Sequence, residues 1–399
     1  MIEISHAWLS YVGFAIAALA MSYSVLVWLI ARRVKPGIRS GHVDAPPVTI
    51  LKPLCGAEPE TYECLRSFCA QDYPVVQIVF GLREATDPAL AIVTRLQREF
   101  PHRDLQVVID RRRHGGNAKV SNLINMMPSA RHAVLILADS DVRVRPDYLA
   151  HIVPPLLDRT VGIVTCPYRG VARPGLWSHL GSMYINEWFM PSVRVAAAGG
   201  SQSFASGATI GIRAQVLAQI GGFAAIANEL ADDFRLGELT RLLGLRTVLS
   251  QVEVETMVEE PTFVGLLRHE TRWLRTIRAL RPIGYGSLVL TFGLPITALE
   301  ALWSRGAPLA LGMFGVALLA RVLLHLTVRR RGLLWQVLLV PLRDFLNVGL
   351  WGWGFVTRRV RWREQVYRIS REGLACPILR IHHDADAQLD EPRSSRVGA

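Results

Sequence analysis

Long apolar segments lie near both ends of the chain, and much shorter ones lie between them. From about Ala7 to Ile30 the chain is almost uncharged, which is long enough to cross a bilayer of about 30 Å. It has no basic start, and Arg32 and Arg33 come after it, which indicates an uncleaved anchor with the following domain in the cytoplasm. We therefore expect a transmembrane anchor over 1–31 and a linker over 32–46.

A second apolar region follows the central part of the chain. Two spans fit it, about Gly284 to Trp303 and about Pro308 to Leu326, and together they would return the chain to the cytoplasmic side. We assign 283–370 to C-terminal membrane helices. The residues 371–399 are polar and are expected to form a tail.

The stretch from Leu333 to Val356 is harder to interpret, because Arg343 and Asp344 interrupt it midway. It fits a span with a buried Arg–Asp pair, or a pair of short helices that lie at the interface or re-enter the membrane. Basic clusters flank both of its ends, and this favours the second interpretation.

Between these regions, short β-branched runs alternate with helical patterns. The alternation predicts an α/β domain with a mainly parallel sheet, which we place at 47–262. Ligands of such sheets bind beyond the carboxyl ends of the strands, so polar residues that directly follow a strand are candidates for function. The candidate strands are Val48–Pro53, Val76–Leu82, Leu105–Ile109, Val134–Ala138 and Val161–Cys166, and the candidate helices are Pro88–Phe100 and Pro146–Leu157.

Composition narrows the classes of function. The net charge is +12, and it is carried almost wholly by arginine, because Lys35, Lys52 and Lys119 are the only lysines. The arginines gather beside the apolar segments, which suits anionic lipid headgroups. No basic and aromatic reading surface is recognisable, so we expect no nucleic-acid partner. The five cysteines are an odd number without zinc spacing, which indicates reduced thiols.

Two aspartates directly follow the apolar run Val134–Ala138. Asp139 and Asp141 are separated by one residue, so both can lie at the end of one strand. Carboxylates in that place can hold Mg²⁺ or Mn²⁺ together with a diphosphate. Asp-Ser-Asp is also ordinary in a turn, so the pattern alone leaves both interpretations open.

A second acidic pair, Asp232 and Asp233, opens the helical pattern Phe234–Leu243. A carboxylate at a helix start is explained as an N-cap or a partner of the helix dipole. That explanation covers one aspartate well and two less well. The functional interpretation makes one of them a general base that takes the proton of an acceptor hydroxyl.

Arginines recur on one side of the helical pattern at 263–282, and leucine and isoleucine on another. The pattern predicts a basic amphipathic helix at the membrane interface, where anchoring alone would explain it. His269 and Arg272 are three residues apart on one face, with Trp273 beside them. They can also close over a diphosphate, since arginine matches phosphate geometry.

Nine short motifs follow one another along the chain: Leu51–Glu58, Ser67–Pro74, Gln77–Gly81, Asp87–Ala89, Asn117–Leu123, Ala138–Asp141, Ala231–Phe234, Arg268–Trp273 and Trp362–Arg368. Their order and spacing resemble the ceramide glucosyltransferase-type family of GT-A glycosyltransferases. Within it, the chain most resembles the bacterial hopanoid-biosynthesis-associated members. The resemblance implies a Rossmann-like GT-A domain and runs from about Val48 to about Arg368.

The resemblance also implies roles for the acidic residues. Asp87 would lie near the nucleoside of a UDP-sugar. Asp139 and Asp141 would hold Mg²⁺ or Mn²⁺ and the diphosphate. Asp232 would be the catalytic base. Asp233 stands where related sequences often carry an aromatic residue, so it ranks second as a catalytic residue.

Other motif residues would bind substrate by the same resemblance. Lys52, Glu58 and Lys119 would line the nucleotide pocket. Arg272 and Trp273 fit the family's motif near the membrane. That motif usually begins with Gln or Arg, and here His269 stands in that position.

The expected activity is therefore an inverting transfer of one sugar from UDP-N-acetylglucosamine or UDP-glucose to a hydroxyl of a membrane lipid. A hopanoid polyol (bacteriohopanetetrol) or ceramide is the expected acceptor, and the expected place is the cell inner membrane, with several spans and a cytoplasmic catalytic domain. The alternatives are a processive polysaccharide synthase, a non-catalytic nucleotide-sugar-binding protein, and transfer to a polyprenyl phosphate, which needs no base. The sequence leaves the oligomeric state open.

Overall fold

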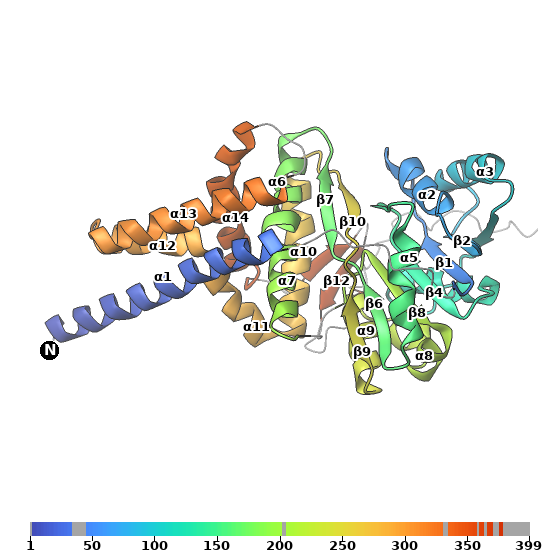
Figure 1. Ribbon diagram of the computed structural model, residues 1–399, viewed down its shortest axis with the longest axis horizontal. Helices are drawn as coiled ribbons and strands as arrows, with labels where there is room; N and C mark the ends of the chain where they lie inside the picture. Colours follow the sequence, from blue (N-terminus) through green and yellow to red (C-terminus); the bar gives the residue numbers. More distant parts are fainter. Residues whose placement is uncertain are drawn as a thin grey trace, which may run out of the picture.

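The computed structural model describes residues 2–33, 45–201, 205–329, 334–356, 359–362, 365–369 and 375–377. It consists of an α/β domain and a bundle of long helices that extends from one side of it (Figure 1). The helices α6 (Leu176–Tyr184), α7 (Met190–Ala198) and α10 (Phe263–Leu280) stand across the base of the bundle, between it and the sheets. Most of the linker predicted at 32–46 and of the tail predicted at 371–399 lies outside the described residues.

Seven strands form the central sheet: β1 (Val48–Pro53), β2 (Val76–Leu82), β3 (Asp104–Ile109), β4 (Val134–Ala138), β6 (Val161–Thr165), β8 (Thr209–Arg213) and β9 (Arg246–Leu249). Their order is β3-β2-β1-β4-β8-β6-β9. Adjacent strands run parallel, except that β8 is antiparallel to both β4 and β6. The prediction of a mainly parallel sheet is confirmed, and all five predicted strands are present.

Helices cover both faces of this sheet. Successive residues of its strands point to opposite sides, and apolar side chains on both sides need to be buried. Ile50 belongs to the hydrophobic core on one face and Leu51 to the core on the other. The predicted helix Pro146–Leu157 is divided, since Pro154 and Pro155 cannot donate backbone hydrogen bonds. The covering elements are α2 (Thr61–Cys69), α3 (Ala89–Glu99), α4 (Ala118–Met126), η1 (Met127–Ser129), α5 (Tyr148–Ile152), η2 (Pro154–Leu157), α8 (Ala214–Gln219), η4 (Phe223–Ile226) and α9 (Asp232–Leu242).

A second sheet lies between the central sheet and the helices at the base of the bundle (Figure 1). Its strands are β5 (Val142–Arg143), β10 (Val254–Val258) and β7 (Tyr168–Ala172), in that order. The chain passes from β7 into α6 and from β10 into α10. A π-helical turn, η3 (Ile185–Phe189), joins α6 to α7. The small sheet therefore connects the carboxyl end of β4 with the helices next to the bundle.

Two helices of the bundle, α1 (Ile2–Arg33) and α13 (Pro308–Val328), are long and apolar enough to cross a membrane. The span predicted at Gly284–Trp303 is not one straight helix. The chain there forms α11 (Pro282–Ser287), η5 (Leu288–Thr291) and α12 (Gly293–Trp303), with a bend of 66° before α12. Pro295 has no N–H to continue the helix toward the carbonyl of Thr291, which accounts for a break at this place.

The Arg343–Asp344 pair, which belonged to the less favoured of the two interpretations, does not form. Both lie in α14 (Leu339–Trp353) and both are buried, but they do not bind each other. Arg343 pairs with Glu270 of α10, and Asp344 pairs with Arg321 of α13. Consecutive residues of a helix do not face each other, so neighbours in sequence find partners on different sides.

The helical part of the region predicted at 283–370 ends with α14. It is preceded by the 3-10 turn η6 (Leu334–Leu338). The stretch from Leu333 to Val356, which had two possible interpretations, is therefore occupied by a turn and a short helix. A third sheet follows, made of β11 (Arg359–Trp362), β12 (Gln365–Ile369) and β13 (Ala375–Pro377).

Candidate functional site

Lys119 brings two of the predicted acidic motifs together. Its Nζ atom lies 2.7 Å from Oδ1 of Asp139, at the end of β4, and 3.2 Å from Oδ2 of Asp232, at the start of α9. Lys119 and Asp232 are far apart in sequence, so their contact depends on the fold. The site is therefore a single cluster in which one ammonium group joins carboxylates from two elements.

The start of α4 positions Lys119. Asn117 caps this helix by accepting a hydrogen bond from the backbone N–H of Val120. Its backbone N–H donates to the carbonyl of Ala227, and its side-chain amide donates to the carbonyl of Glu229. The start of α4 is thus fastened to the segment that leads into Asp232.

The close approach of these two segments requires a glycine. A Cβ atom on Gly115 would lie 2.5 Å from the carbonyl oxygen of Ala227. Since that neighbour is backbone, it cannot move away as a flexible side chain would. Gly115 therefore lets the loop before α4 pack against the segment before α9.

The cluster also shifts the acidity of its members. Burial opposes the charge of Lys119, but Asp139 and Asp232 raise its pKa overall, so the lysine is held as a cation. Burial raises the pKa of Asp139, and the nearby carboxylate of Asp141 adds to that effect against Lys119. Burial and the charge of Asp232 raise the pKa of Asp233 to about 6. The carboxyl group of Asp233 therefore titrates closer to neutral pH than an ordinary aspartate does.

The turn after β4 presents Asp139 and Asp141 side by side with fixed backbones. The N–H of Asp139 donates to Ala208, and the N–H of Met257 in β10 donates to the carbonyl of Asp141. The hydroxyl of Thr256 donates to Oδ2 of Asp141 at 2.6 Å. These bonds hold the two carboxylates on one short turn at the carboxyl edge of the sheet.

The pair suits a divalent cation that also binds substrate. Mg²⁺ is commonly held by one or two carboxylates plus phosphate oxygens, which is the donor set that Asp139 and Asp141 offer. Within the described ranges, no group of three or more His, Cys, Asp and Glu side chains is arranged to hold a metal by itself. A diphosphate would have to complete the coordination.

Lys52 lies beneath this turn and has no exposed surface. Its ammonium group donates to the carbonyl oxygen of Asp139 and sits 3.9 Å from the centre of the Phe68 ring. Burial lowers the pKa of Lys52 to about 8, and Cys64 and Asp141 oppose that shift. In this arrangement Lys52 supports the backbone of Asp139 from inside the domain.

Asp87 and Glu58 lie near the ends of β1 and β2, at the same edge of the sheet. Both carboxylate oxygens of Asp87 accept from the N–H of Gly56, at 3.1 and 3.0 Å, and Oδ1 also accepts from Ala89 at the start of α3. Glu58 is exposed in the loop after β1. Asp87 thus ties that loop to α3.

On α10, the three predicted residues lie together. His269 hydrogen-bonds through Nδ1 with Oε1 of Glu260, at 2.7 Å, and its ring meets Trp273 edge-on. Trp273 packs against Tyr184 of α6 and Phe189 of the π-turn. Trp273 is therefore part of the contact between α10 and the helices at the base of the bundle.

Tyr168, the first residue of β7, is a member of the site that the sequence did not reveal. Burial and the charges of Asp233, Asp139 and Asp141 raise its pKa, and Arg272 opposes them. Tyr168 therefore lies close enough to the aspartates of the cluster and to Arg272 of α10 for their charges to act on its phenol. The one available signal was the position of Tyr168 just after the predicted strand Val161–Cys166.

A comparison with protein-family models finds a match over residues 12–375 to Glycosyl transferase family 21. The chain belongs to this family. The match covers most of the chain, including the acidic cluster and the helices of the bundle.

Curated relatives agree with the family over shorter stretches. The chain is 30% identical over 138 residues to ceramide glucosyltransferase of Gibberella zeae, covering 32% of this chain and 26% of that one. It is 22% identical over 240 residues to ceramide glucosyltransferase 3 of Caenorhabditis elegans, covering 59% and 52%. The matches thus span from a quarter to about half of these relatives.

Among solved structures, a mannosyltransferase of Pyrobaculum calidifontis in complex with GDP-Man and Mn²⁺ superposes with a TM-score of 0.50. The sequences are 22% identical, and the match covers 87% of this chain and 95% of that one. At this identity the likeness concerns the fold, and it agrees with the GT-A-like α/β domain.

Proposed function

We propose that this family 21 protein transfers one sugar from a UDP-sugar to a hydroxyl of a membrane lipid, with inversion at the anomeric carbon. The observation that carries the proposal is the joining of the Asp139 and Asp232 carboxylates through Lys119, with Asp233 beside them. A cluster of this kind offers a place for a leaving diphosphate and a base for an attacking hydroxyl. UDP-N-acetylglucosamine and UDP-glucose are the proposed donors.

In this proposal the diphosphate lies next to Asp139 and Asp141. Mg²⁺ or Mn²⁺ bound there would offset the negative charge that develops on the leaving group. Arg272 supplies a fixed positive charge on the side of α10. Lys119 offsets the repulsion between the carboxylates of Asp139 and Asp232, and Lys52 donates to the carbonyl of Asp139 from inside the domain. Asp87, Glu58 and the loops around them are proposed to bind the nucleoside.

The electrostatics favour Asp233 over Asp232 as the base. Asp232 forms an ion pair with Lys119 at 3.2 Å, so its carboxylate is already engaged within the protein. Asp233 has a pKa of about 6, close to the pH at which a general base is most effective. We therefore reverse the order taken from the sequence: Asp233 takes the proton of the acceptor hydroxyl, and Asp232 holds Lys119.

A lipid acceptor is supported by the position of the site. Tyr168 packs on Phe189, which also packs against Trp273 of α10, so β7 is in contact with the helices at the base of the bundle. With α1 and α13 in the inner membrane and the α/β domain in the cytoplasm, a lipid hydroxyl would approach along these helices. A hopanoid polyol such as bacteriohopanetetrol and ceramide are the proposed acceptors, the second because the curated relatives named above are ceramide glucosyltransferases.

The test uses the full-length chain in lipid nanodiscs with radiolabelled UDP-sugar, Mg²⁺ or Mn²⁺, and ceramide or a hopanoid polyol. Asp233→Asn should lower transfer by roughly 100-fold to 10,000-fold, the usual contribution of a general base, while UDP still binds. Glu238→Gln, on the same helix and away from the acidic cluster in an ion pair with Arg235, is the matched control and should stay active. Full activity of Asp233→Asn would show that Asp233 is not the base.

The same assay separates the alternatives. A processive synthase would yield a polymer instead of a lipid that carries one sugar, as product sizing would show. A non-catalytic binding protein would release no UDP. Transfer to a polyprenyl phosphate would proceed without either Asp232 or Asp233, because a phosphate needs no general base.

A further inference from the structure

The helix α14 and the turn η6 before it divide their exposed and buried side chains in an uncommon way. Between residues 335 and 356, every exposed side chain is apolar, and glycine supplies the other exposed positions. The charged and amide side chains of α14, which belong to Arg343, Asp344 and Asn347, are all buried. A surface helix of a protein in water has the opposite division, with charges outside and apolar residues inside. The exposed side of α14 therefore fits an apolar surrounding.

The exposed residues form one stripe along the helix, which we call the α14 stripe. Positions that are three, four, seven or eight residues apart lie on the same side of a helix. The members of the stripe follow this spacing, and at least half of each side chain is exposed: Leu338 (78%), Leu342 (51%), Phe345 (52%) and Trp353 (57%). The other side of α14 packs on α10 and α13, where Arg343 and Asp344 form their ion pairs.

The direction of α14 differs from that of the long helices. Figure 1 shows α14 upright beside α6 and α10, across the direction of α1 and α13. Its 15 residues are about 22 Å long, which is shorter than the hydrocarbon core of a bilayer, about 30 Å. Within the described ranges, α14 is not among the helices that are long and apolar enough to cross a membrane. When α1 and α13 cross the membrane, α14 therefore lies in its plane.

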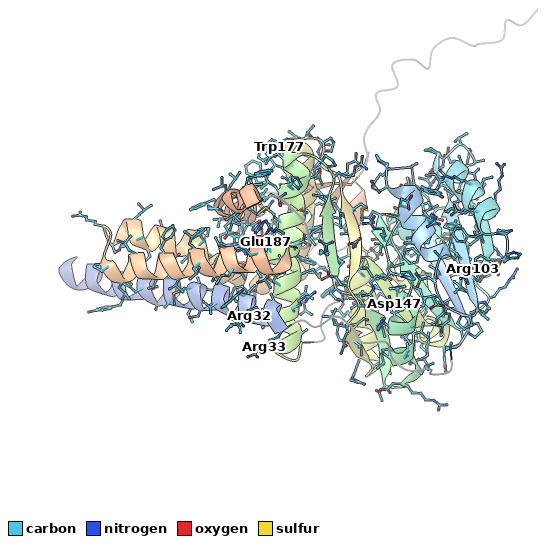
Figure 2. The ribbon with its side chains drawn as sticks, turned by 45° about the horizontal axis from the view of Figure 1, so that its top comes forward. Arg32, Arg33, Arg103, Asp147, Trp177 and Glu187 are labelled. Atoms are coloured by element: carbon cyan, nitrogen blue, oxygen red, sulfur yellow. The ribbon has the colours of Figure 1, made fainter. Side chains whose placement is uncertain are left out.

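The neighbours of α14 indicate its level in the membrane. Figure 2 shows Trp177, Glu187 and Arg33 along the upright helices at the base of the bundle. Arg33 ends α1 on the side that is expected to be cytoplasmic, so this layer lies at the headgroups of the cytoplasmic leaflet. Asp344 ties α14 to Arg321, which lies about 10 Å before the end of α13 at 1.5 Å per residue. α14 is therefore placed where the headgroups give way to the acyl chains.

Aromatic rings extend the apolar surface from η6 onto the first turns of α6 and α10. Trp335 of η6 is exposed, and its ring meets His179 of α6 edge-on. Trp177, near the start of α6, packs against the exposed ring of Phe263, at the start of α10, with ring centres 4.9 Å apart. Tryptophan is enriched at the level of the headgroups, because its ring is apolar and its N–H is polar. These rings favour the same level for the end of the stripe.

The basic clusters in the sequence agree with this placement. Arg329–Arg331 precede the stretch that contains α14, and the arginines between 358 and 363 follow it. Arginine is retained on the cytoplasmic side of membrane helices. With both clusters on one side, the stretch between them does not cross the bilayer.

We propose that the α14 stripe is a membrane-docking surface whose partner is the acyl chains of the cytoplasmic leaflet, with α14 in the plane of the membrane. Lipid is favoured over a second copy of this chain, because the stripe lies in a layer that the bilayer around α1 and α13 already reaches. The inference rests on the membrane placement of α1 and α13 and not on sugar transfer. Arg343, on the buried side, binds both oxygens of Glu270, so docking is passed to α10 through one side chain.

The depth of spin labels tests this placement with the full-length chain in lipid nanodiscs. The replacements Cys55→Ser and Cys376→Ser leave only native thiols that are buried. One label is then attached at Leu338→Cys, Phe345→Cys or Trp353→Cys. Collisions of the label with oxygen, which is concentrated in lipid, and with a water-soluble nickel chelate report its depth. Docking in the plane predicts one common depth for the three labels, to within about 5 Å, which is one helical turn.

Labels on α13 provide the matched control. Leu309, Leu319 and Leu326 are exposed on this helix. If α13 crosses the membrane, the label at Leu319→Cys should lie deeper than the other two by about 10 Å, at 1.5 Å per residue. An unchanged midpoint of thermal unfolding shows that each labelled chain is folded. A label at Leu319→Cys that is no deeper than the others would remove the membrane placement of α13 and overturn the docking surface with it.

Three results for the stripe would overturn the inference directly. A label at Phe345→Cys that lies about 10 Å deeper than its two companions would show a span or a re-entrant pair of helices. Labels that only the nickel chelate reaches would place the stripe in water. Labels that neither reagent reaches, with magnetic coupling between chains, would show that a second copy covers the stripe. None of these results depends on sugar transfer, so the docking surface and the proposed function stand or fail separately.

Discussion

Asp233→Asn should stabilise the protein while it removes the proposed base. Asparagine retains an oxygen that accepts the N–H of Phe234, so the local hydrogen bond survives. It has no charge to bury. The pKa of Asp233 is raised from 3.8 to about 6, mainly by burial and then by Asp232, and each unit corresponds to about 1.4 kcal/mol. Ionised Asp233 therefore costs the fold up to about 3 kcal/mol, and less to the extent that solvent screens its partly exposed carboxylate.

The effect depends on pH in a defined direction. Because the folded pKa lies above the unfolded one, the folded chain holds the proton more tightly between pH 4 and 6. The contribution of Asp233 to stability consequently falls as the pH rises through that window and is constant above it. Asparagine does not titrate, so the difference between variant and wild type should be near zero at pH 4 and largest at pH 7 and above.

Thermal unfolding in detergent micelles at pH 4, 6 and 7.5 measures this difference. At pH 7.5 the midpoint of Asp233→Asn should exceed that of wild type by up to roughly 4 °C. Sugar transfer by wild type should rise with pH through about 6, as the base loses its proton, and Asp233→Asn should show no such rise. If the variant is no more stable than wild type at pH 7.5, then burial of the ionised Asp233 carboxylate does not destabilise the fold.

Three further substitutions test the contacts of the site and the bundle. Lys119→Met should lower transfer by roughly 100-fold, because the carboxylates that it joins lose their common cation, and the activity assay measures this. Arg343→Met should destabilise the fold by about 3–5 kcal/mol by leaving Glu270 buried without its partner, and Glu270→Met in addition should restore most of that loss in unfolding measurements. Gly115→Ala should cost about 1–3 kcal/mol and lower UDP binding, because its Cβ would meet a backbone carbonyl 2.5 Å away.

Local patterns in the sequence predicted the strands that hold the site. β1, β2 and β4 are short, apolar and buried on both faces, and β-branched runs of this kind are visible without knowledge of their partners. β8 was missed because Thr209–Arg213 follows a stretch of small residues. Its two neighbouring strands, β4 and β6, are both far away from it in sequence. A strand that is inserted antiparallel into the middle of a sheet leaves no local signal of its place.

The contacts that unite the site, like the place of β8, join residues that are far apart in sequence. The sequence marked Lys119, Asp139 and Asp232 as separate candidates, and nothing local showed that one ammonium group joins them. The order of Asp232 and Asp233 as bases also depends on which of them meets Lys119. That choice follows from the packing of α4 against the segment before α9, which periodicity does not report.

The charges in α14 show how a membrane-side element is tied to the site. Arg343 and Asp344 are adjacent, so they point in different directions and bind different helices. Arg343 holds Glu270, which lies between His269 and Arg272 on α10, whereas Asp344 holds Arg321 in the bundle. One turn of α14 therefore fixes α10 relative to α13. Since breaking a buried ion pair is costly, a shift of the bundle would strain the helix that carries Arg272, and α10 is held at a fixed place relative to the long helices.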